Sequence, residues 1–329
     1  MKVVFFHRKP KSNNFSVECT FQVIREVMPA NVKCIIAQSR YDSRGLFKRL
    51  YNIVEAAFRQ GDVNHITGDV HFLSYLLARD KTLLTILDCV VMYNANGLKR
   101  YFLRLFWYVI PVKRVKLVSV ISQATKNELL KFISCDPDKV RVIPVCISPN
   151  FIRHDKGFNA EKPRILQIGT AENKNLRRLV RALQGIPCQL EIVGKLSYEQ
   201  KALLQDCNIE YTNSSNLSEA EIIKKYNACD LVAFVSTYEG FGMPILEANA
   251  VGRPVITSKI LSMPEVAGEA ACLVDPYNFS EIRAGIQRII NDDSYRDKLI
   301  KTGFLNIKRF DPEVIAGQYT NIYLSLIHI

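Results

Sequence analysis

The stretch that decides the fold runs from Leu231 to Pro254 and reads LVAFVSTYEGFGMPILEANAVGRP. Its first five residues, Leu231–Val235, are apolar at every position, which is typical of a parallel strand covered on both faces. Small and flexible residues follow, and the pattern then predicts a helix that Pro244 opens and that Gly252 and Pro254 close. We therefore expect a strand–loop–helix unit of an α/β sheet.

The loop before this helix has the composition of an anion site. Gly240 and Gly242 allow close approach of the backbone to a ligand, which a Cβ would hinder. The start of a helix offers free N–H groups and a positive dipole end, which favour a phosphate. Glu239 lies in the loop and Glu247 is expected on the first helical turn, and a carboxylate accepts two hydroxyls at once. The pattern fits a sugar nucleotide, and the alternative is an ordinary turn with solvated glutamates.

Glu239 and Glu247, with seven residues between them and Gly-Phe-Gly-Met-Pro inside, resemble the signature of glycosyltransferase family 4, the glycosyl transferases group 1. The resemblance extends from about Thr67 to Tyr323 and is most specific from Ile165 to Pro276. It implies a retaining glycosyltransferase of the GT-B fold, in which two Rossmann-like domains with doubly wound parallel sheets face a central donor cleft.

The length of 329 residues also favours two domains. We expect a Rossmann-like domain on the acceptor side over residues 1–148 and an irregular linker over 149–162. Residues 163–305 are expected to form the domain that binds the nucleotide sugar. In relatives, the helix that corresponds to residues 306–329 crosses back to the first domain.

A βα rhythm is visible along both halves. Lys2–Phe6 is expected to be a central first strand. The other predicted strands are 32–37, 63–67, 82–87, 116–122, 140–144, 164–168, 188–193, 209–211, 231–235, 255–257 and 272–274. The predicted helices are 18–27, 46–60, 69–79, 123–133, one from about 176, one from 218 that ends before 230, 244–252, a short one from 263, 279–291, 294–309 and 312–323.

The resemblance places further donor contacts after the strand that ends at Ile168. Relatives carry an Arg just after Gly169 and a Lys a few residues later, and both bind the donor diphosphate. Here Thr170 stands at the Arg position and Lys174 matches the Lys. A cation near a helix N-terminus is unfavourable unless an anion lies between them, which favours a phosphate over a solvated lysine. Asn213 falls where relatives hold the nucleobase.

The resemblance also implies roles in catalysis. Glu239 would hold the hydroxyls of the donor sugar, and Glu247 those of the ribose. Lys174 and the helix start would stabilise the departing diphosphate, with backbone N–H groups of Phe241, Gly242 and Met243 against sugar and phosphate. The leaving phosphate accepts the proton of the acceptor hydroxyl, so neither a dedicated base nor a metal or cofactor is expected.

Three polar features of the first half contain candidate site residues. Asp88 follows a predicted strand at the expected acceptor edge, where it either orients an acceptor hydroxyl or caps the next turn. His65 lies mid-strand and is expected to be structural, whereas His71 lies at a strand-to-helix turn, a slightly more favourable position for a site residue. Asp136-Pro137-Asp138 has the form of a metal-binding Asp-x-Asp, but its place before a strand indicates turn residues.

The positive charge is concentrated in the first half. Residues 1–150 hold 23 Lys and Arg against 11 Asp and Glu, whereas residues 151–329 hold 21 of each. The loop 7–17 is polar and basic, and it either contacts a substrate or is a solvated turn. The segment 97–116 mixes cations with aromatic residues and fits an anionic membrane surface or a helix packed on its sheet. Because no nucleic-acid-binding module is recognisable, we expect no nucleic-acid partner.

The remaining features bear on location and on rival functions. The nine scattered cysteines and the short apolar run at the N-terminus indicate a cytosolic protein, and a peripheral position on the inner face of the membrane is compatible with this. The acceptor is expected to be a glycan or a lipid-linked saccharide. A sugar-nucleotide epimerase of the same architecture and a non-enzymatic protein that binds anionic polymers remain alternatives. The last six residues, 324–329, resemble a translated sequencing adapter, so the natural end is expected to differ.

Overall fold

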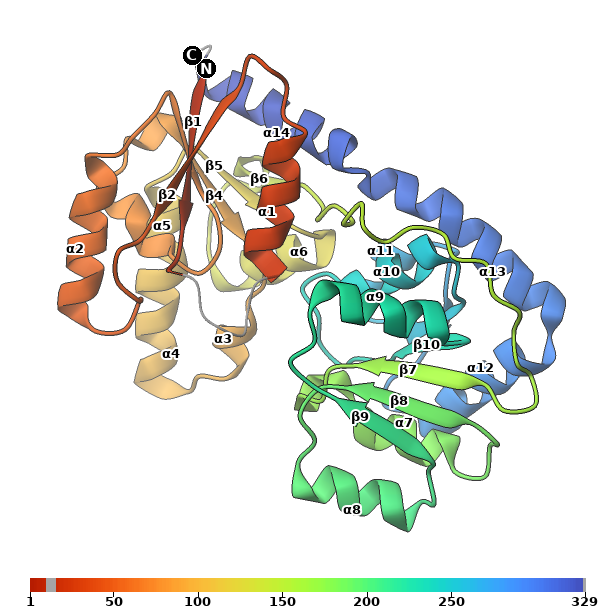
Figure 1. Cartoon of the computed structure of the whole chain (residues 1–329). Helices are drawn as coiled ribbons and strands as arrows, with labels where there is room; N and C mark the ends of the chain where they lie inside the picture. Colours follow the sequence, from red (N-terminus) through yellow and green to blue (C-terminus); the bar gives the residue numbers. More distant parts are fainter. Residues whose placement is uncertain (10–15, 328–329) are drawn as a thin grey trace. The chain divides into compact units, whose positions relative to one another are not determined.

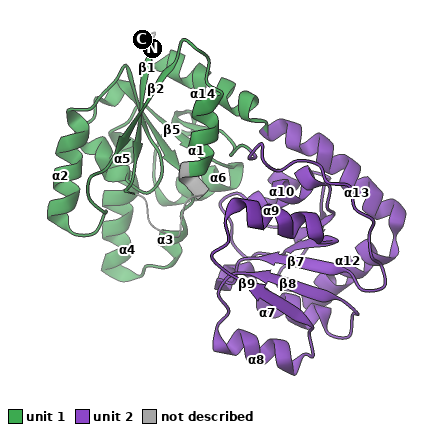
Figure 2. Cartoon of the chain, viewed as in Figure 1, with its two compact units in different colours: residues 1–146, 311–329 green, residues 147–310 purple. Residues whose placement is uncertain are grey.

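The structure is a computed structural model that describes residues 1–9 and 16–327. The chain divides into two compact units: unit 1 comprises residues 1–146 and 311–329, and unit 2 comprises residues 147–310 (Figure 2). Each unit contains a six-stranded parallel sheet with helices on both faces. The two doubly wound α/β units confirm the predicted fold class.

The sheet of unit 1 has the order β2-β1-β3-β4-β5-β6 (Figure 1). Its strands are β1 (Lys2–His7), β2 (Lys33–Gln38), β3 (Val63–Ile66), β4 (Thr82–Ile86), β5 (Leu117–Val120) and β6 (Val140–Val142). Val3 of β1 pairs with Cys34 on one side and with Val63 on the other. The first strand is thus one position in from the edge. It is an interior strand and not the central one, because β2 is added outside it and the later strands are added on its other side.

Helices cover both faces of this sheet. They are α1 (Ser16–Glu26), α2 (Leu46–Ala57), the 3-10 turns η1 (His71–Tyr75), η2 (Arg79–Lys81) and η4 (Pro137–Lys139), α3 (Val90–Tyr93), α4 (Gly97–Leu103), the π-helical η3 (Arg104–Val109), α5 (Ile110–Lys113), α6 (Gln123–Phe132) and α14 (Pro312–Ile327). The first and last helices share one core, in which Phe21 and Tyr323 pack with Phe5. The opposite face is covered by α2, η1, α5 and α6.

The sheet of unit 2 has the order β12-β11-β10-β7-β8-β9. Its strands are β7 (Arg164–Ile168), β8 (Gln189–Val193), β9 (Tyr211–Ser214), β10 (Leu231–Phe234), β11 (Val255–Ser258) and β12 (Cys272–Val274). Strand β10 pairs directly with β7, so that Leu231 lies beside Ile165. Because parallel strands end at the same edge, the loops that follow β7 and β10 become neighbours although they are far apart in sequence.

The helical elements of unit 2 are η5 (Glu172–Lys174), α7 (Leu176–Leu183), α8 (Tyr198–Asp206), α9 (Glu219–Ala228), α10 (Met243–Val251), α11 (Met263–Ala267), α12 (Phe279–Asn291), α13 (Asp293–Asn306) and η6 (Ile307–Phe310). Apolar residues of α7, α8, α12 and α13 form one core with the sheet. The other face carries α9, α10 and α11 (Figure 1). Ser218 and Glu221 form the capping box that the sequence predicts at the start of α9.

Two predicted elements differ from the structure. The helix expected over 69–79 is wrong: the segment forms the short 3-10 turn η1, whose residues His71 to Ser74 are buried, and η2 follows from Arg79. The strand expected over 209–211 begins at Tyr211 and continues to Ser214. Asn213 therefore lies inside an edge strand and not in the loop after it.

The two histidines and the Asp136–Asp138 turn have structural environments. His65 is fully buried, with Nδ1 2.8 Å from the Tyr323 hydroxyl and Nε2 2.7 Å from the Thr85 hydroxyl, and burial lowers the pKa of His65 well below its usual value. Nδ1 of buried His71 lies 2.8 Å from the Trp107 carbonyl oxygen. Asp136 accepts a hydrogen bond from the Asp138 N–H at the start of η4, as expected of a turn. Within the loop 7–17, residues 10–15 lie outside the described residues.

Candidate active site

The loops that follow β7 and β10 are joined by hydrogen bonds at the carboxyl edge of the unit 2 sheet. The Thr237 N–H donates to the Asn173 carbonyl over 2.8 Å. In the other direction, Asn173 Nδ2 donates to the Tyr238 carbonyl over 2.9 Å. The strand order thus brings η5 and the glycine loop 239–242 to one place, which is the edge where open α/β sheets bind ligands.

Lys174 and Glu239 form the ionic centre of this place. Lys174 Nζ lies 2.6 Å from Glu239 Oε1, and the two side chains are only 22% and 15% exposed. The ammonium also lies 4.9 Å from the ring centroid of Phe234 on β10. Low exposure strengthens the attraction between the two charges. The sequence assigned both residues to a donor but did not predict that they contact each other.

Two glycines at strand ends make room for side chains. Gly169 follows β7 with φ of +89°, and a Cβ there would lie 2.9 Å from Cγ of Lys174. The stem of the lysine therefore passes directly over Gly169. Gly194 follows β8 with φ of +139°, and a Cβ there would lie 2.9 Å from the side chain of Thr170. The Thr170 hydroxyl donates to the Lys195 carbonyl over 2.8 Å, so that Thr170 ties the ends of β7 and β8 together.

The glycine loop presents its backbone at the start of α10. Gly242 is the N-cap with φ of +123°, and the Ser262 hydroxyl contacts the carbonyls of Glu239 and Phe241 at 2.9 and 2.7 Å. In the described part of the chain, neither Phe241 nor Gly242 donates a backbone hydrogen bond. The helix itself offers less than its sequence implied, because Pro244 has no N–H and the next N–H, that of Ile245, donates to the Gly242 carbonyl.

Glu247 lies on the second turn of α10 and not on the first as expected, because the helix begins at Met243. The Tyr226 hydroxyl of α9 donates a hydrogen bond to Glu247 Oε2 over 2.5 Å. Burial raises the pKa of Glu247 to about 7, against the opposing effect of the Tyr226 hydrogen bond. Burial and the neighbouring carboxylate raise the pKa of Tyr226 well above its usual value, so the tyrosine keeps its proton.

The Asn213 side chain is engaged within the sheet. Its Nδ2 donates to the carbonyls of Ile192 and Gly194 over 3.1 and 2.7 Å. This pair of bonds joins β9 to the end of β8 beside Gly194. A nucleobase contact at Asn213 remains a prediction. The backbone of β9 would make it more readily than the side chain, because Nδ2 already donates two hydrogen bonds.

Asp88 belongs to unit 1, whereas the predicted donor residues belong to unit 2. Its Oδ1 accepts a hydrogen bond from the Val90 N–H over 3.0 Å, which caps the first turn of α3. Its carbonyl accepts a hydrogen bond from the Tyr108 hydroxyl over 3.3 Å. One carboxylate oxygen of Asp88 thus has the role that the capping alternative predicts. The orientation of an acceptor hydroxyl by Asp88 remains a prediction.

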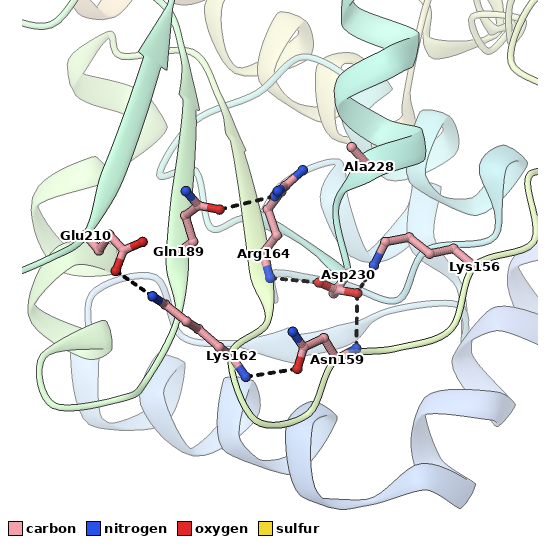
Figure 3. Close-up of a pocket in the computed structure, with 8 residues that line it drawn as sticks. All are labelled: Lys156, Asn159, Lys162, Arg164, Gln189, Glu210, Ala228 and Asp230. Atoms are coloured by element: carbon pink, nitrogen blue, oxygen red, sulfur yellow. Dashed lines mark hydrogen bonds and ion pairs between the residues drawn. The ribbon is translucent and has the colours of Figure 1, made fainter.

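A polar cavity of about 300 Å³ lies at the opposite edge of the unit 2 sheet, where β7 and β8 begin (Figure 3). Asp230 binds Lys156 there and accepts hydrogen bonds from the backbone N–H groups of Asn159 and Arg164. Lys162 pairs with Glu210 over 2.7 Å. Because these charges are largely neutralised by one another, we assign this cavity no ligand.

Three residues of the site were not singled out in the sequence. Asn173 and Ser262 fix the loops around Lys174 and Glu239, and Tyr226 holds Glu247. Asn173 could have been found, because it adjoins Lys174 in a polar turn. Tyr226 and Ser262 carry no local signal, since their partners are 21 and 23 residues away.

Residues 1–9 and 16–327 contain no group of three or more His, Cys, Asp or Glu side chains placed to hold a metal ion. Nor do they contain a helix with the length and hydrophobicity needed to cross a membrane.

The fold and this polar edge define the class of protein. The chain is similar in structure to sucrose-phosphate synthase from Thermosynechococcus elongatus, with a TM-score of 0.78 and 18% identity over 99% of this chain and 98% of that one. It is also similar to Anabaena Alr3699/HepE in complex with UDP-glucose, with a TM-score of 0.78 and 17% identity over 99% and 100% of the two chains. The class is therefore the two-domain GT-B fold.

A family model also matches the sequence. Residues 149–305 match the family described as Glycosyl transferases group 1. A relative, the O-antigen chain mannosyltransferase B of Escherichia coli, is 29% identical over 234 residues, which are 64% of this chain and 61% of that protein. The chain thus spans less than two thirds of the length of this curated relative.

Proposed function

We propose that the protein transfers a sugar from a nucleoside diphosphate sugar to a glycan or lipid-linked acceptor, with retention at the anomeric carbon. The observation that carries this proposal is the contact of Lys174 with Glu239 beside Gly242. This contact sets a cation and a carboxylate beside the N–H groups of Phe241 and Gly242, which donate no backbone hydrogen bond in the described part of the chain. A diphosphate, the sugar hydroxyls and the developing negative charge each find a chemically matched group there.

The ion pair sets how the donor enters. In the free protein, Lys174 and Glu239 neutralise each other. When the donor binds, the ammonium turns to the diphosphate oxygens and the carboxylate accepts hydrogen bonds from the sugar hydroxyls. The same two groups are then positioned across the bond that breaks, where Lys174 stabilises the leaving phosphate. Because the leaving phosphate accepts the acceptor proton, the transfer needs no separate base.

Glu247 and Tyr226 form the ribose end of the proposed donor site. The Tyr226 hydroxyl already donates to one carboxylate oxygen, which holds the side chain in place. An ionised Glu247 then accepts hydrogen bonds from the two ribose hydroxyls. Burial makes the ionised form costly, so ribose binding and ionisation of Glu247 favour each other.

The acceptor and the cellular role are part of the same proposal. The relatives include an O-antigen chain mannosyltransferase, which supports cell-surface polysaccharide biosynthesis and makes mannosyl donors the first to test. The neighbour with bound UDP-glucose supports a nucleotide-sugar donor. We place the protein in the cytoplasm, with its basic unit 1 at an anionic membrane surface, and Asp88 on the acceptor hydroxyl.

A donor panel tests the proposal. Nucleoside diphosphates and their sugars are added to the protein, and the thermal midpoint is followed, since a ligand that binds the native state raises it by mass action. We expect one nucleotide series to stabilise the wild type and to act much less on Lys174→Ala and Glu247→Ala. Stabilisation that both variants retain in full would place the nucleotide elsewhere and overturn the site.

Product analysis separates transfer from epimerisation. An epimerase of the same architecture converts the donor alone into its isomer, whereas a transferase needs an acceptor to consume the donor at a substantial rate. The donor that gives the largest thermal shift is incubated with and without membrane lipid extract. Consumption that depends on the extract, with sugar incorporated into lipid, is the expected result, and isomerisation without the extract would refute transfer.

A further inference from the structure

Helix α2 of unit 1 exposes an apolar stripe. Its buried residues are only Asn52, Ile53 and Ala56. The stripe repeats at helical spacing along the outer side and ends at the residue that follows the helix. It consists of Leu46 (69% exposed), Phe47 (86%), Leu50 (49%), Tyr51 (42%), Val54 (48%) and Phe58 (86%). A surface helix of a globular protein normally shows polar residues on this side, so the α2 stripe calls for a partner.

The next exposed apolar group lies on the helical segment α4–η3. It comprises Leu98 (76% exposed), Tyr101 (55%), Phe102 (52%) and Phe106 (48%). The two segments meet where the Arg49 guanidinium of α2 lies over the Trp107 ring of η3, 5.5 Å from its centroid. Unit 1 therefore carries two contacting helical segments with exposed large apolar side chains.

The charge around both segments is positive. Residues 40–59 contain five Lys and Arg against two Asp and Glu, and residues 97–116 contain six Lys and Arg and no acid. Lys48 and Arg59 are paired with the two acids, Asp42 and Glu55. Arg44, Lys99 and Arg100 are among the cations that are exposed to solvent. Apolar side chains with surplus cations around them match an anionic bilayer interface, which offers hydrocarbon and negative charge together.

We propose that the α2 stripe is a docking surface for an anionic lipid bilayer. Phe47 and Phe58 enter the boundary between headgroups and acyl chains, and the cations of α2 and α4 face the lipid phosphates. An anionic polymer would engage the cations but would leave the stripe in water. The inference extends the proposed membrane location by naming the inserted element, and it does not depend on the transfer chemistry.

Vesicle flotation tests this surface with the full-length protein. The vesicles are phosphatidylcholine alone or phosphatidylcholine with phosphatidylglycerol. The test variant is Phe47→Ser with Phe58→Ser, and Tyr198→Ser is the matched control because Tyr198 is an 83% exposed aromatic residue of α8 in unit 2. We expect the wild type and the control to bind phosphatidylglycerol vesicles, less at high salt, and the double variant to bind them at least tenfold more weakly.

Other outcomes overturn the inference. Equal binding by the wild type and the double variant would show that the stripe does not contact the membrane. No binding by the wild type would show that an anionic bilayer is not the partner. If the wild type self-associates without lipid, and the double variant is monomeric but still binds vesicles, the stripe is an interface between two copies. Nucleotide-induced thermal shifts are measured on the same proteins. Vesicle binding without such shifts would refute the proposed function and leave the docking surface in place.

Discussion

The two units carry different kinds of surface. In unit 2, the ionic side chains of the candidate site are engaged with one another: Lys174 with Glu239, and Tyr226 with Glu247. In unit 1, the excess positive charge accompanies large apolar side chains that have no cover, above all on α2. The difference indicates that unit 2 is preorganised for one small charged ligand, whereas unit 1 is shaped for an extended surface.

The largest effect is expected from Lys174→Ala. Because the lysine supplies positive charge where the diphosphate departs, turnover should fall by about 100- to 1,000-fold, the usual cost of removing one such electrostatic contact. Lys201→Ala changes an exposed lysine of α8 and serves as the matched control. The measurement is the turnover number with the donor selected by the panel. Equal turnover numbers for the two variants would show that unit 2 does not use Lys174 in catalysis.

Glu247→Ala should weaken donor binding by about 1 to 3 kcal/mol, because charged hydrogen bonds to the ribose are lost. Tyr226→Phe removes only the hydroxyl that holds Glu247, so its effect should be smaller and of the same sign. Calorimetric titration with the nucleoside diphosphate measures both affinities. A larger loss in Tyr226→Phe than in Glu247→Ala would mean that the tyrosine contacts the ligand itself.

Gly169→Ala tests preorganisation without removing a charge. Both Gly169 and Gly185 have positive φ, so an alanine at either costs about 1 to 2 kcal/mol of backbone strain. Only at Gly169 does the new Cβ meet another residue, the Lys174 stem. Gly169→Ala should therefore lower turnover at saturating donor while Gly185→Ala keeps it. Similar turnover in the two variants, with similar losses of stability, would show that the position of the Lys174 side chain does not affect turnover.

The pH dependence of donor affinity reports on Glu247. With a pKa of about 7, the carboxylate is mostly neutral at pH 6 and mostly ionised at pH 8, so nucleotide affinity should rise about tenfold between them if only the ionised form binds. The nucleotide affinity of Glu247→Gln should be low and should not change between pH 6 and pH 8. A rise that persists in Glu247→Gln would assign the titration to another group.

The same group links stability to pH with the opposite sign. The folded pKa of Glu247 is raised above its unfolded value of 4.5. Its contribution to the free energy of unfolding is therefore complete below about pH 4.5 and is lost as the pH rises through about 7, by about 3 kcal/mol. Denaturant titrations of wild type and Glu247→Gln between pH 5 and 8 measure this term as a difference between the two proteins.

The smallest effect is expected at Asp88 in unit 1. Asp88→Asn keeps an oxygen for the Val90 N–H and removes the charge, whereas Asp88→Ala also removes the cap at a cost of about 1 kcal/mol. If Asp88 orients the acceptor hydroxyl, both variants should lower transfer several-fold and leave donor binding unchanged. If the transfer rate falls only in Asp88→Ala, and by an amount that its loss of stability explains, Asp88 is only a capping residue.

Local patterns account for most elements of the fold. The apolar run Leu231–Val235, the capping box at Ser218 and the strands 164–168 and 272–274 follow from hydrogen bonding and periodicity within a few residues. The glycines at 169, 240 and 242 could be assigned to a ligand edge for the same reason. The 69–79 segment was predicted wrongly because the local pattern does not report that tertiary packing buries the four consecutive residues from His71 to Ser74.

By itself, the sequence determined the α/β class, the two-unit organisation of alternating strands and helices, and the residue types that suit a sugar nucleotide. Only the tertiary structure decided which of those residues meet. Pairing of β10 with β7 carries Glu239 to Lys174 across 65 positions, and packing of α9 beside α10 gives Glu247 its tyrosine. In unit 1, the packing of Ile53 and Ala56 into the core decides which side of α2 is left exposed. Periodicity reports the faces of each element, whereas the choice of neighbour depends on how whole elements pack.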